Sequence, residues 1–219
     1  MVGSINDGEV YRFISKPWDT QEIQAVVAEA VSIGKRMIQR GAGAALLPPV
    51  TRDAVLVVGQ DRVVHDAVTD CLAGAAPVSH AEGITDALEF LRANETAVIV
   101  ADVDAGLDNY LVFLNALKRE RPEVLVIALT SASDSEYVME LINAAQIYRF
   151  LNKPVNFDML DRYLRAAIAQ HEAYRAAPEL LEEHAVHESQ KAIESTIGRW
   201  IRDGLRSLRG KFGGGRLRL

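Results

Sequence analysis

The sequence predicts an α/β protein built on a five-stranded parallel sheet with helices on both faces. Between residues 53 and 171, apolar runs of strand length alternate with segments in which apolar residues recur at helical spacing. Such an alternation is typical of parallel sheets, because the chain must return to the same end of the sheet before each new strand. With 49% hydrophobic and 25% charged residues in a chain of 219, the protein can bury a core of this size.

The predicted elements follow one another without long gaps. Strands are expected at residues 54–58, 77–79, 97–101, 124–129 and 147–151. Helices are expected at residues 62–73, 84–94, 110–120, 134–144 and 157–170. Ser133 with Glu136, and Asn156, provide capping residues for the starts of the last two helices. The predicted domain therefore spans residues 53–171.

A second copy of one stretch precedes this domain. The sequence Tyr-Arg-Phe-x-x-Lys-Pro occurs at residues 11–17 and again at residues 148–154. The first copy predicts a strand over 10–14 that ends at a lysine and a proline. A helix is expected to follow, because Asp19 and Glu22 form a capping-box pattern before apolar residues at helical spacing. We interpret residues 1–40 as the strand and long helix left from a related domain, joined by a linker over 41–52.

The C-terminal part is predicted to be a helical extension over 172–212 with a flexible tail over 213–219. Its first half is acidic, and from Lys191 it becomes basic around an apolar stripe that includes Trp200. Such a helix binds an anionic membrane surface or a partner's groove, or it covers the protein's own core or a second copy of the chain. A homo-oligomer through the N-terminal or the C-terminal helix is the prediction that these segments favour.

Composition and charge exclude several classes of protein. The net charge of −6 argues against a protein that coats nucleic acid. Cys71 is the single cysteine, so no internal disulfide is possible, and no apolar run approaches the length that spans a bilayer. No signal peptide is visible at the N-terminus. The sequence therefore predicts a cytoplasmic protein.

Polar residues follow the predicted strands at the edge where ligands bind in parallel sheets. Gly59, Gln60 and Asp61 follow the first strand, Asp102 and Asp104 the third, Thr130 and Ser131 the fourth, and Lys153 the fifth. An aspartate, a hydroxyl and a lysine at one edge form a site that accepts and holds a phosphoryl group. The simpler alternative is a salt bridge between Lys153 and Asp102.

With these residues, the stretch 53–171 resembles a response-regulator receiver domain of bacterial two-component signalling. The resemblance implies a flavodoxin-like fold, phosphorylation by a histidine kinase, and Asp102 as the phospho-acceptor. It further implies that Thr130 and Phe150 are the switch hydroxyl and the switch aromatic residue, and that Lys153 binds the phosphoryl group. The usual partner surface of such domains lies on the fourth helix, fifth strand and fifth helix, which here includes Tyr148 and Arg149.

One departure from the receiver pattern affects the expected chemistry. Receivers carry an acidic pair after the first strand that holds Mg²⁺, whereas this chain has Gly59 and Gln60 there. Asp61, Asp102 and Asp104 remain as weaker candidate ligands, and the loop after Asp102 is one residue short and lacks the usual proline. The sequence therefore predicts a pseudo-receiver that acts by protein contact rather than as an enzyme, with phosphorylation at Asp102 impaired.

Two alternatives from other classes stay open. The four apolar residues before Asp102-x-Asp104 also resemble the first motif of haloacid-dehalogenase-type phosphatases, with Asp102 as nucleophile and Asp104 as general acid. Those enzymes need a further acidic pair beyond the lysine, whereas a helix follows Lys153 directly here. The second alternative is an adaptor tethered to a membrane or nucleic acid by the basic C-terminal helix.

Overall fold

The computed structural model describes residues 51–131 and 147–178, and eight single positions besides: Thr20, Ile23, Gln24, Val27, Ala28, Val31, Leu181 and Asp203. The chain divides into two compact units, Met1–Pro48 and Pro49–Leu219. Three predicted elements lie outside the described residues, namely the strand over 10–14, the helix over 134–144 and almost all of the C-terminal extension with Trp200.

In the first unit, the described positions between Thr20 and Val31 are helical, as the apolar spacing predicts. Val27 and Val31, four residues apart on this helix, expose 53% and 49% of their surface. Residues four apart lie on the same side of a helix, so this helix has an exposed apolar stripe.

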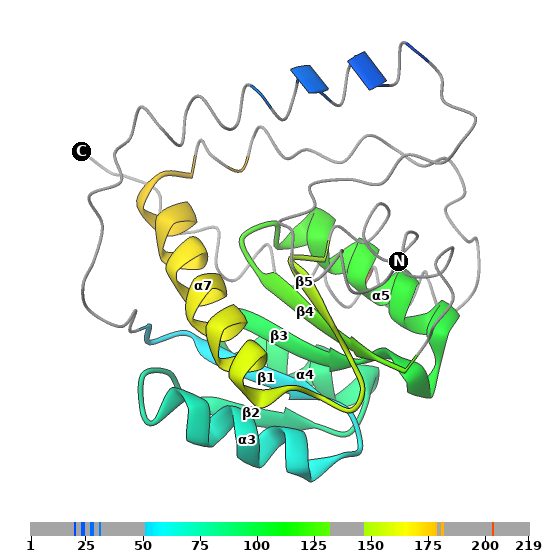
Figure 1. Ribbon diagram of the computed structural model, residues 1–219, viewed down its shortest axis with the longest axis vertical. Coiled ribbons are helices and arrows are strands. Elements are labelled where there is room, and N and C mark those ends of the chain that lie inside the picture. Colours follow the sequence, from blue (N-terminus) through cyan, green and yellow to red (C-terminus); the bar gives the residue numbers. More distant parts are fainter. Residues whose placement is uncertain are drawn as a thin grey trace. The chain divides into compact units, whose positions relative to one another are not determined.

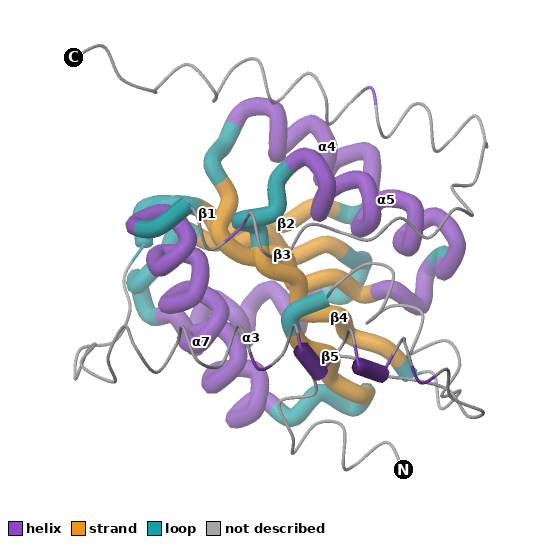
Figure 2. Tube along the Cα trace, turned by 90° about the horizontal axis from the view of Figure 1, so that it is seen from above, coloured by secondary structure: helices purple, strands orange, loops and turns teal. Residues whose placement is uncertain are grey.

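The second unit contains the predicted five-stranded sheet, with all four strand pairs parallel and the order β2-β1-β3-β4-β5. Helices α3 and α7 cover one face and α4 and α5 the other (Figure 1, Figure 2). This is the flavodoxin-like arrangement that the sequence predicts. The elements are β1 Ala54–Val58, α3 Arg62–Leu72, β2 Val78–Ala81, α4 Ile84–Ala93, β3 Thr96–Asp102, the short 3₁₀ helix η1 Val103–Ala105, α5 Leu107–Glu120, β4 Leu125–Thr130, β5 Arg149–Asn152 and α7 Phe157–Ala176.

The strands agree with the predicted ones to within two residues at each end. Strand β3 includes Asp102, because this residue still pairs with Leu129 of β4. Helix α5 begins three residues earlier than predicted, where Asn109 and Tyr110 donate backbone hydrogen bonds to the carbonyl of Gly106. Helix α7 continues across the predicted domain end at residue 171, because His171 and Tyr174 are buried in the core.

One hydrophobic core of the described residues lies between the sheet and the pair α3 and α7. Alternate residues of the central strands, such as Val55 and Val57 of β1 and Val98 and Val100 of β3, pack there with apolar residues of the two helices. The residues between them, Leu56 and Ile99, are also fully buried. Burial on both faces accounts for the continuous apolar runs by which the strands are recognised in the sequence.

Two of the α-helices, α3 and α7, begin with a side-chain cap beside the carboxyl edge of the sheet. Asn156 accepts a hydrogen bond from the backbone N–H of Met159 at 3.1 Å and starts α7, as predicted. Asp61 accepts one from the backbone N–H of Val63 at 2.9 Å and starts α3. None of the helices among the described residues could span a bilayer.

Helix α5 contains a buried lysine. Lys118 is 9% exposed, and its Nζ donates a hydrogen bond to the carbonyl of Pro122 at 2.8 Å. Burial lowers the pKa of Lys118 to about 8, although Glu123 opposes the shift. Because this pKa is lower in the folded chain, the unfolded chain binds the proton of Lys118 more tightly, and the charged lysine destabilises the fold. The destabilisation is complete at pH 7 and decreases as the pH rises from about 8 to about 10.5.

We therefore expect Lys118→Met to raise the free energy of unfolding at pH 7 by about 1–2 kcal/mol, the lost hydrogen bond offsetting part of the relieved penalty. Urea unfolding of both proteins at pH 7 and pH 9.5 measures this, with the exposed neighbour Arg119→Met as the control. The gain should shrink at the higher pH. A variant that is less stable than wild type at pH 7 would contradict the expectation.

Candidate functional site

The carboxyl ends of β3, β4 and β5 bring the candidate residues together. Asp102 is the last residue of β3, Thr130 the last of β4, and Lys153 follows the last residue of β5. The pairing of β4 with β5 places Thr130 and Lys153 side by side. Thr130 lies opposite Asn152, and the backbone N–H of Lys153 donates to the carbonyl of Thr130 at 2.9 Å. The Lys153–Pro154 peptide bond is cis.

Lys153 bridges the two aspartates. Its Nζ lies 2.6 Å from Oδ1 of Asp102 and 3.1 Å from Oδ2 of Asp104. Burial lowers the pKa of Lys153, but hydrogen bonds and the charges of both aspartates outweigh burial, and the net shift is upward. The ammonium is thus held in its charged form, and the predicted salt bridge between Lys153 and Asp102 is confirmed.

Asp104 is the most heavily hydrogen-bonded side chain of the site. Its Oδ1 accepts from the hydroxyl of Thr130 at 2.7 Å and from the backbone N–H of Ser131 at 3.0 Å. Its Oδ2 accepts from the same N–H at 2.9 Å and from the Ser131 hydroxyl at 2.7 Å. Burial raises the pKa of Asp104, but the hydrogen bonds from Thr130, Ser131 and Lys153 together lower it by more than burial raises it. The net shift is downward. Asp104 is therefore a carboxylate at neutral pH.

Gly59 packs directly on Asp102. A Cβ atom at Gly59 would lie 2.8 Å from the Cβ of Asp102, and the glycine has a φ of +154°, which other residues rarely adopt. Its backbone is held on both sides, since its N–H donates to the carbonyl of Ala81 at 2.9 Å and its own carbonyl contacts Nε2 of His80 at 2.8 Å. Position 59 therefore cannot hold a side chain unless the backbone of Gly59 or the side chain of Asp102 moves.

The family profile described as the response regulator receiver domain matches residues 55–165, more than half of the chain. The chain belongs to the response-regulator receiver family. Receiver domains are modules of signal transduction, so this chain contains a signalling domain of the two-component type. The comparison with curated proteins found no match.

Solved structures agree on the fold. The signal receiver domain of an HD domain-containing protein from Pseudomonas fluorescens Pf-5 is 23% identical, with a TM-score of 0.53 over 62% of this chain and 98% of that one. An adenylate cyclase structure from Rhodopirellula baltica is 23% identical, with a TM-score of 0.51 over 60% and 98% of the two chains. A response regulator from Thermotoga maritima is 23% identical, with a TM-score of 0.50 over 54% and 99%.

The residues at this receiver site do not fit a magnesium ion. Gly59 and Gln60 provide no carboxylate, and Asp61 is an exposed helix cap. Lys153 already pairs with Oδ1 of Asp102, and both oxygens of Asp104 accept hydrogen bonds. Among the described residues, Asp61, Asp102 and Asp104 do not form a group whose ligand atoms lie within 4.8 Å of one another. We therefore assign no step at this site to a bound metal.

The predicted switch and partner residues occupy the β4 and β5 side of the domain. Thr130 and Phe150 are buried, and Tyr148 and Arg149 are half-buried. The guanidinium of Arg149 lies over the ring of Tyr148, 4.4 Å from its centroid, and 5.8 Å from that of Tyr163 on α7. Tyr148 and Arg149 are thus joined to each other and to α7, while Trp200 lies outside the described residues.

A second polar cluster ties the start of the domain to the end of α7. Asp53 Oδ2 lies 2.9 Å from Nε2 of His171 and 2.8 Å from a guanidinium nitrogen of Arg175, and Nδ1 of His171 lies 2.9 Å from the carbonyl of Glu123. Asp53, His171 and Glu172 form the one group among the described residues with metal-ligand spacing. The short Asp53–His171 contact is a hydrogen bond, however, and the positive charge of Arg175 on the same oxygen disfavours a cation.

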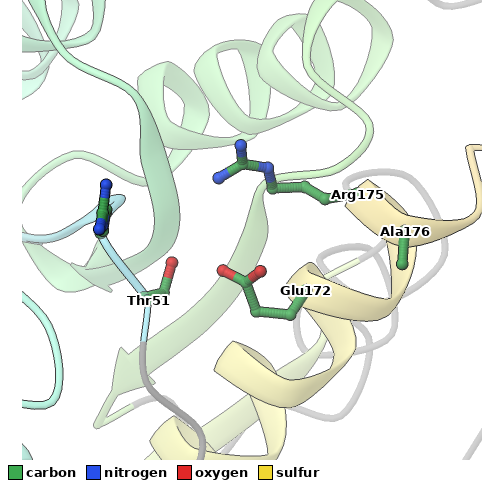
Figure 3. Close-up of a pocket in the computed structure, with 5 residues that line it drawn as sticks. Thr51, Glu172, Arg175 and Ala176 are labelled. Carbon is green, nitrogen blue, oxygen red and sulfur yellow. The ribbon is translucent and has the colours of Figure 1, made fainter.

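This cluster borders a pocket lined by Thr51, Arg52, Glu172, Arg175 and Ala176 (Figure 3). No pattern in the sequence predicts this cluster, because Asp53 and His171 are 118 residues apart and no local motif links them. For Asp104, the sequence predicts only a metal ligand or a general acid. The Asp-x-Asp pattern was the available signal, but its partners Thr130 and Ser131 come from the neighbouring strand end.

Proposed function

We propose that this chain is a pseudo-receiver, a signalling protein that acts by contact with another protein and without regulated phosphorylation of Asp102. The observation that carries the proposal is the contact between Gly59 and Asp102. Phosphoryl transfer to an aspartate needs a cation to offset the charge that develops on the phosphoryl oxygens. An acidic residue at position 59 would be such a cation's ligand, and the close approach of the backbone to Asp102 excludes it.

The charges at the site support the same proposal. A phosphoryl group on Asp102 carries between one and two negative charges and would lie beside the ionised Asp104. Lys153 supplies a positive charge to the two aspartates, which it contacts at 2.6 and 3.1 Å. Like charges at such distances disfavour each other, so an added phosphate would be poorly neutralised.

Receiver domains interact with histidine kinases and other signalling proteins, and we propose a partner of this class. The proposed contact surface contains Tyr148 and Arg149, whose stacked pair offers an aromatic face and a guanidinium, a combination that is common at protein interfaces. We further propose that residues 1–40 are a receiver-like remnant, residues 41–52 a linker, and residues 172–212 with Trp200 an assembly or targeting helix. The exposed Val27 and Val31 suit self-association through the first of these segments.

The phosphatase alternative has less support. Its general acid would be Asp104, whose two oxygens already accept hydrogen bonds from Thr130 and Ser131. Its further acidic pair is not provided directly after Lys153, because Asn156 caps α7 and that helix begins at Phe157. The match to the receiver family supports the signalling interpretation instead.

Incubation of the full chain with Mg²⁺ and acetyl phosphate, followed by intact-mass spectrometry, tests the proposal. We expect no phosphoryl adduct, while a receiver that retains its acidic pair is labelled in parallel. An adduct on wild type that is lost in Asp102→Ala would overturn the proposal. Steady release of phosphate from a monoester by wild type, abolished in the same variant, would support the phosphatase.

A further inference from the structure

Four hydrogen-bond donors at the site converge on a single side chain. They are the hydroxyl of Thr130, the backbone N–H and hydroxyl of Ser131, and the ammonium of Lys153, and all lie within 3.1 Å of an oxygen of Asp104. Three kinds of donor, a hydroxyl, a backbone amide and a cation, thus surround one anion. This is the set of groups that proteins use to hold the oxygens of a phosphoryl group.

The carboxylate of Asp104 satisfies these donors on both of its oxygens. Oδ1 accepts from two donors, and Oδ2 lies within bonding distance of three. A carboxylate offers about four lone-pair positions, so little acceptor capacity is left over. Bonds to a charged acceptor are stronger than neutral ones, so each donor is well held.

Asp104 also lies where it competes with a modified Asp102. Both carboxylates contact the same Nζ of Lys153, and Asp102 accepts a hydrogen bond from the backbone N–H of Asp104 at 3.3 Å. A phosphoryl group on Asp102 would need donors from this same set. The short helix η1 places Asp104 beside Thr130 and Ser131, which belong to the neighbouring strand end.

We propose that Asp104 is a built-in substitute for the phosphoryl group, which holds Thr130 and Ser131 at the end of β4 in the anion-bound arrangement without phosphorylation. This inference rests on the proposed function and deepens it, since it names what sets the state of a receiver that is not phosphorylated. The partner protein then always meets the domain with Thr130 and Ser131 in this arrangement. Removal of the carboxylate, rather than addition of phosphate, changes that state.

Amide hydrogen exchange at Ser131, followed by NMR in the full chain, tests the proposal. In Asp104→Ala we expect exchange at Ser131 to be faster by about tenfold or more, since a charged acceptor is lost. Sodium acetate should restore slow exchange by supplying a carboxylate to the vacated donors, whereas sodium chloride at equal ionic strength should not. In Asp70→Asn, an exposed aspartate of α3, exchange at Ser131 should match wild type.

Asp104→Asn gives a second test that does not depend on a cavity. The amide keeps one acceptor oxygen but adds a donor, so exchange should be intermediate and acetate should have no effect, because the side chain fills the place. Slow exchange at Ile99 in the core of the sheet verifies that each variant is folded. Unchanged exchange at Ser131 in Asp104→Ala, or faster exchange that acetate fails to reverse, overturns the inference. Labelling of wild type by acetyl phosphate would instead overturn the proposed function, because it reports on Asp102 and not on Ser131.

Discussion

Asp53→Ala is expected to lower the free energy of unfolding by about 3 kcal/mol, the upper end of the cost of leaving a buried hydrogen-bonding group without its partner. Asp53 is 7% exposed and His171 is 2% exposed. Both ring nitrogens of His171 face acceptors, the carboxylate of Asp53 and the carbonyl of Glu123. Without Asp53, the N–H at Nε2 is left buried with its acceptor removed.

The same change should weaken the attachment of the last turns of α7, because Asp53 directly precedes β1 and also accepts from Arg175. Urea unfolding followed by circular dichroism measures the total loss. The matched control is Arg175→Gln, which removes the partner whose side chain is 52% exposed and should cost less than about 1 kcal/mol. An equal decrease in the free energy of unfolding in the two variants would contradict the expectation that the buried Asp53–His171 contact contributes more than the exposed Asp53–Arg175 contact.

Gly59→Ala is expected to destabilise the fold by about 2–4 kcal/mol, because it adds both a backbone penalty and a clash. The new Cβ would lie 2.8 Å from the Cβ of Asp102 at a φ of +154°. Asp102 cannot move away freely, since Lys153 and the backbone N–H of Asp104 hold its Oδ1. Unfolding in urea gives the loss directly.

Gly83→Ala serves as the control, because a Cβ there meets no atom within 4 Å, and its stability should change by less than about 1 kcal/mol. Gln60→Asp, at an exposed position, should likewise be tolerated. A Gly59→Ala variant as stable as wild type would show that position 59 accepts a side chain, and therefore that an acidic ligand is not excluded there. The proposal of a pseudo-receiver would then lose its main support.

The repeated stretch at residues 11–17 and 148–154 illustrates how far sequence patterns extend. The second copy forms β5 and places Lys153 beside Asp102, as predicted. The first copy lies outside the described residues, so its assignment as a receiver remnant stays a prediction. The shared motif thus predicts a strand followed by a lysine, but the role of Lys153 depends on Asp102, which belongs to another strand.

The fold class, four helices and all five strands of the described domain, and the residues at the edge where the site forms, could be predicted from the sequence. This was possible because strand burial, helix periodicity and capping are local and leave a regular pattern of residue types. The role of each site residue depends on contacts that form in the folded domain. Asp104 accepts from Thr130 and Ser131, Gly59 closes on Asp102, and Asp53 pairs with His171. Each of these contacts joins residues in or directly beside different strands or helices, so its distance depends on strand order and register and not on spacing along the chain.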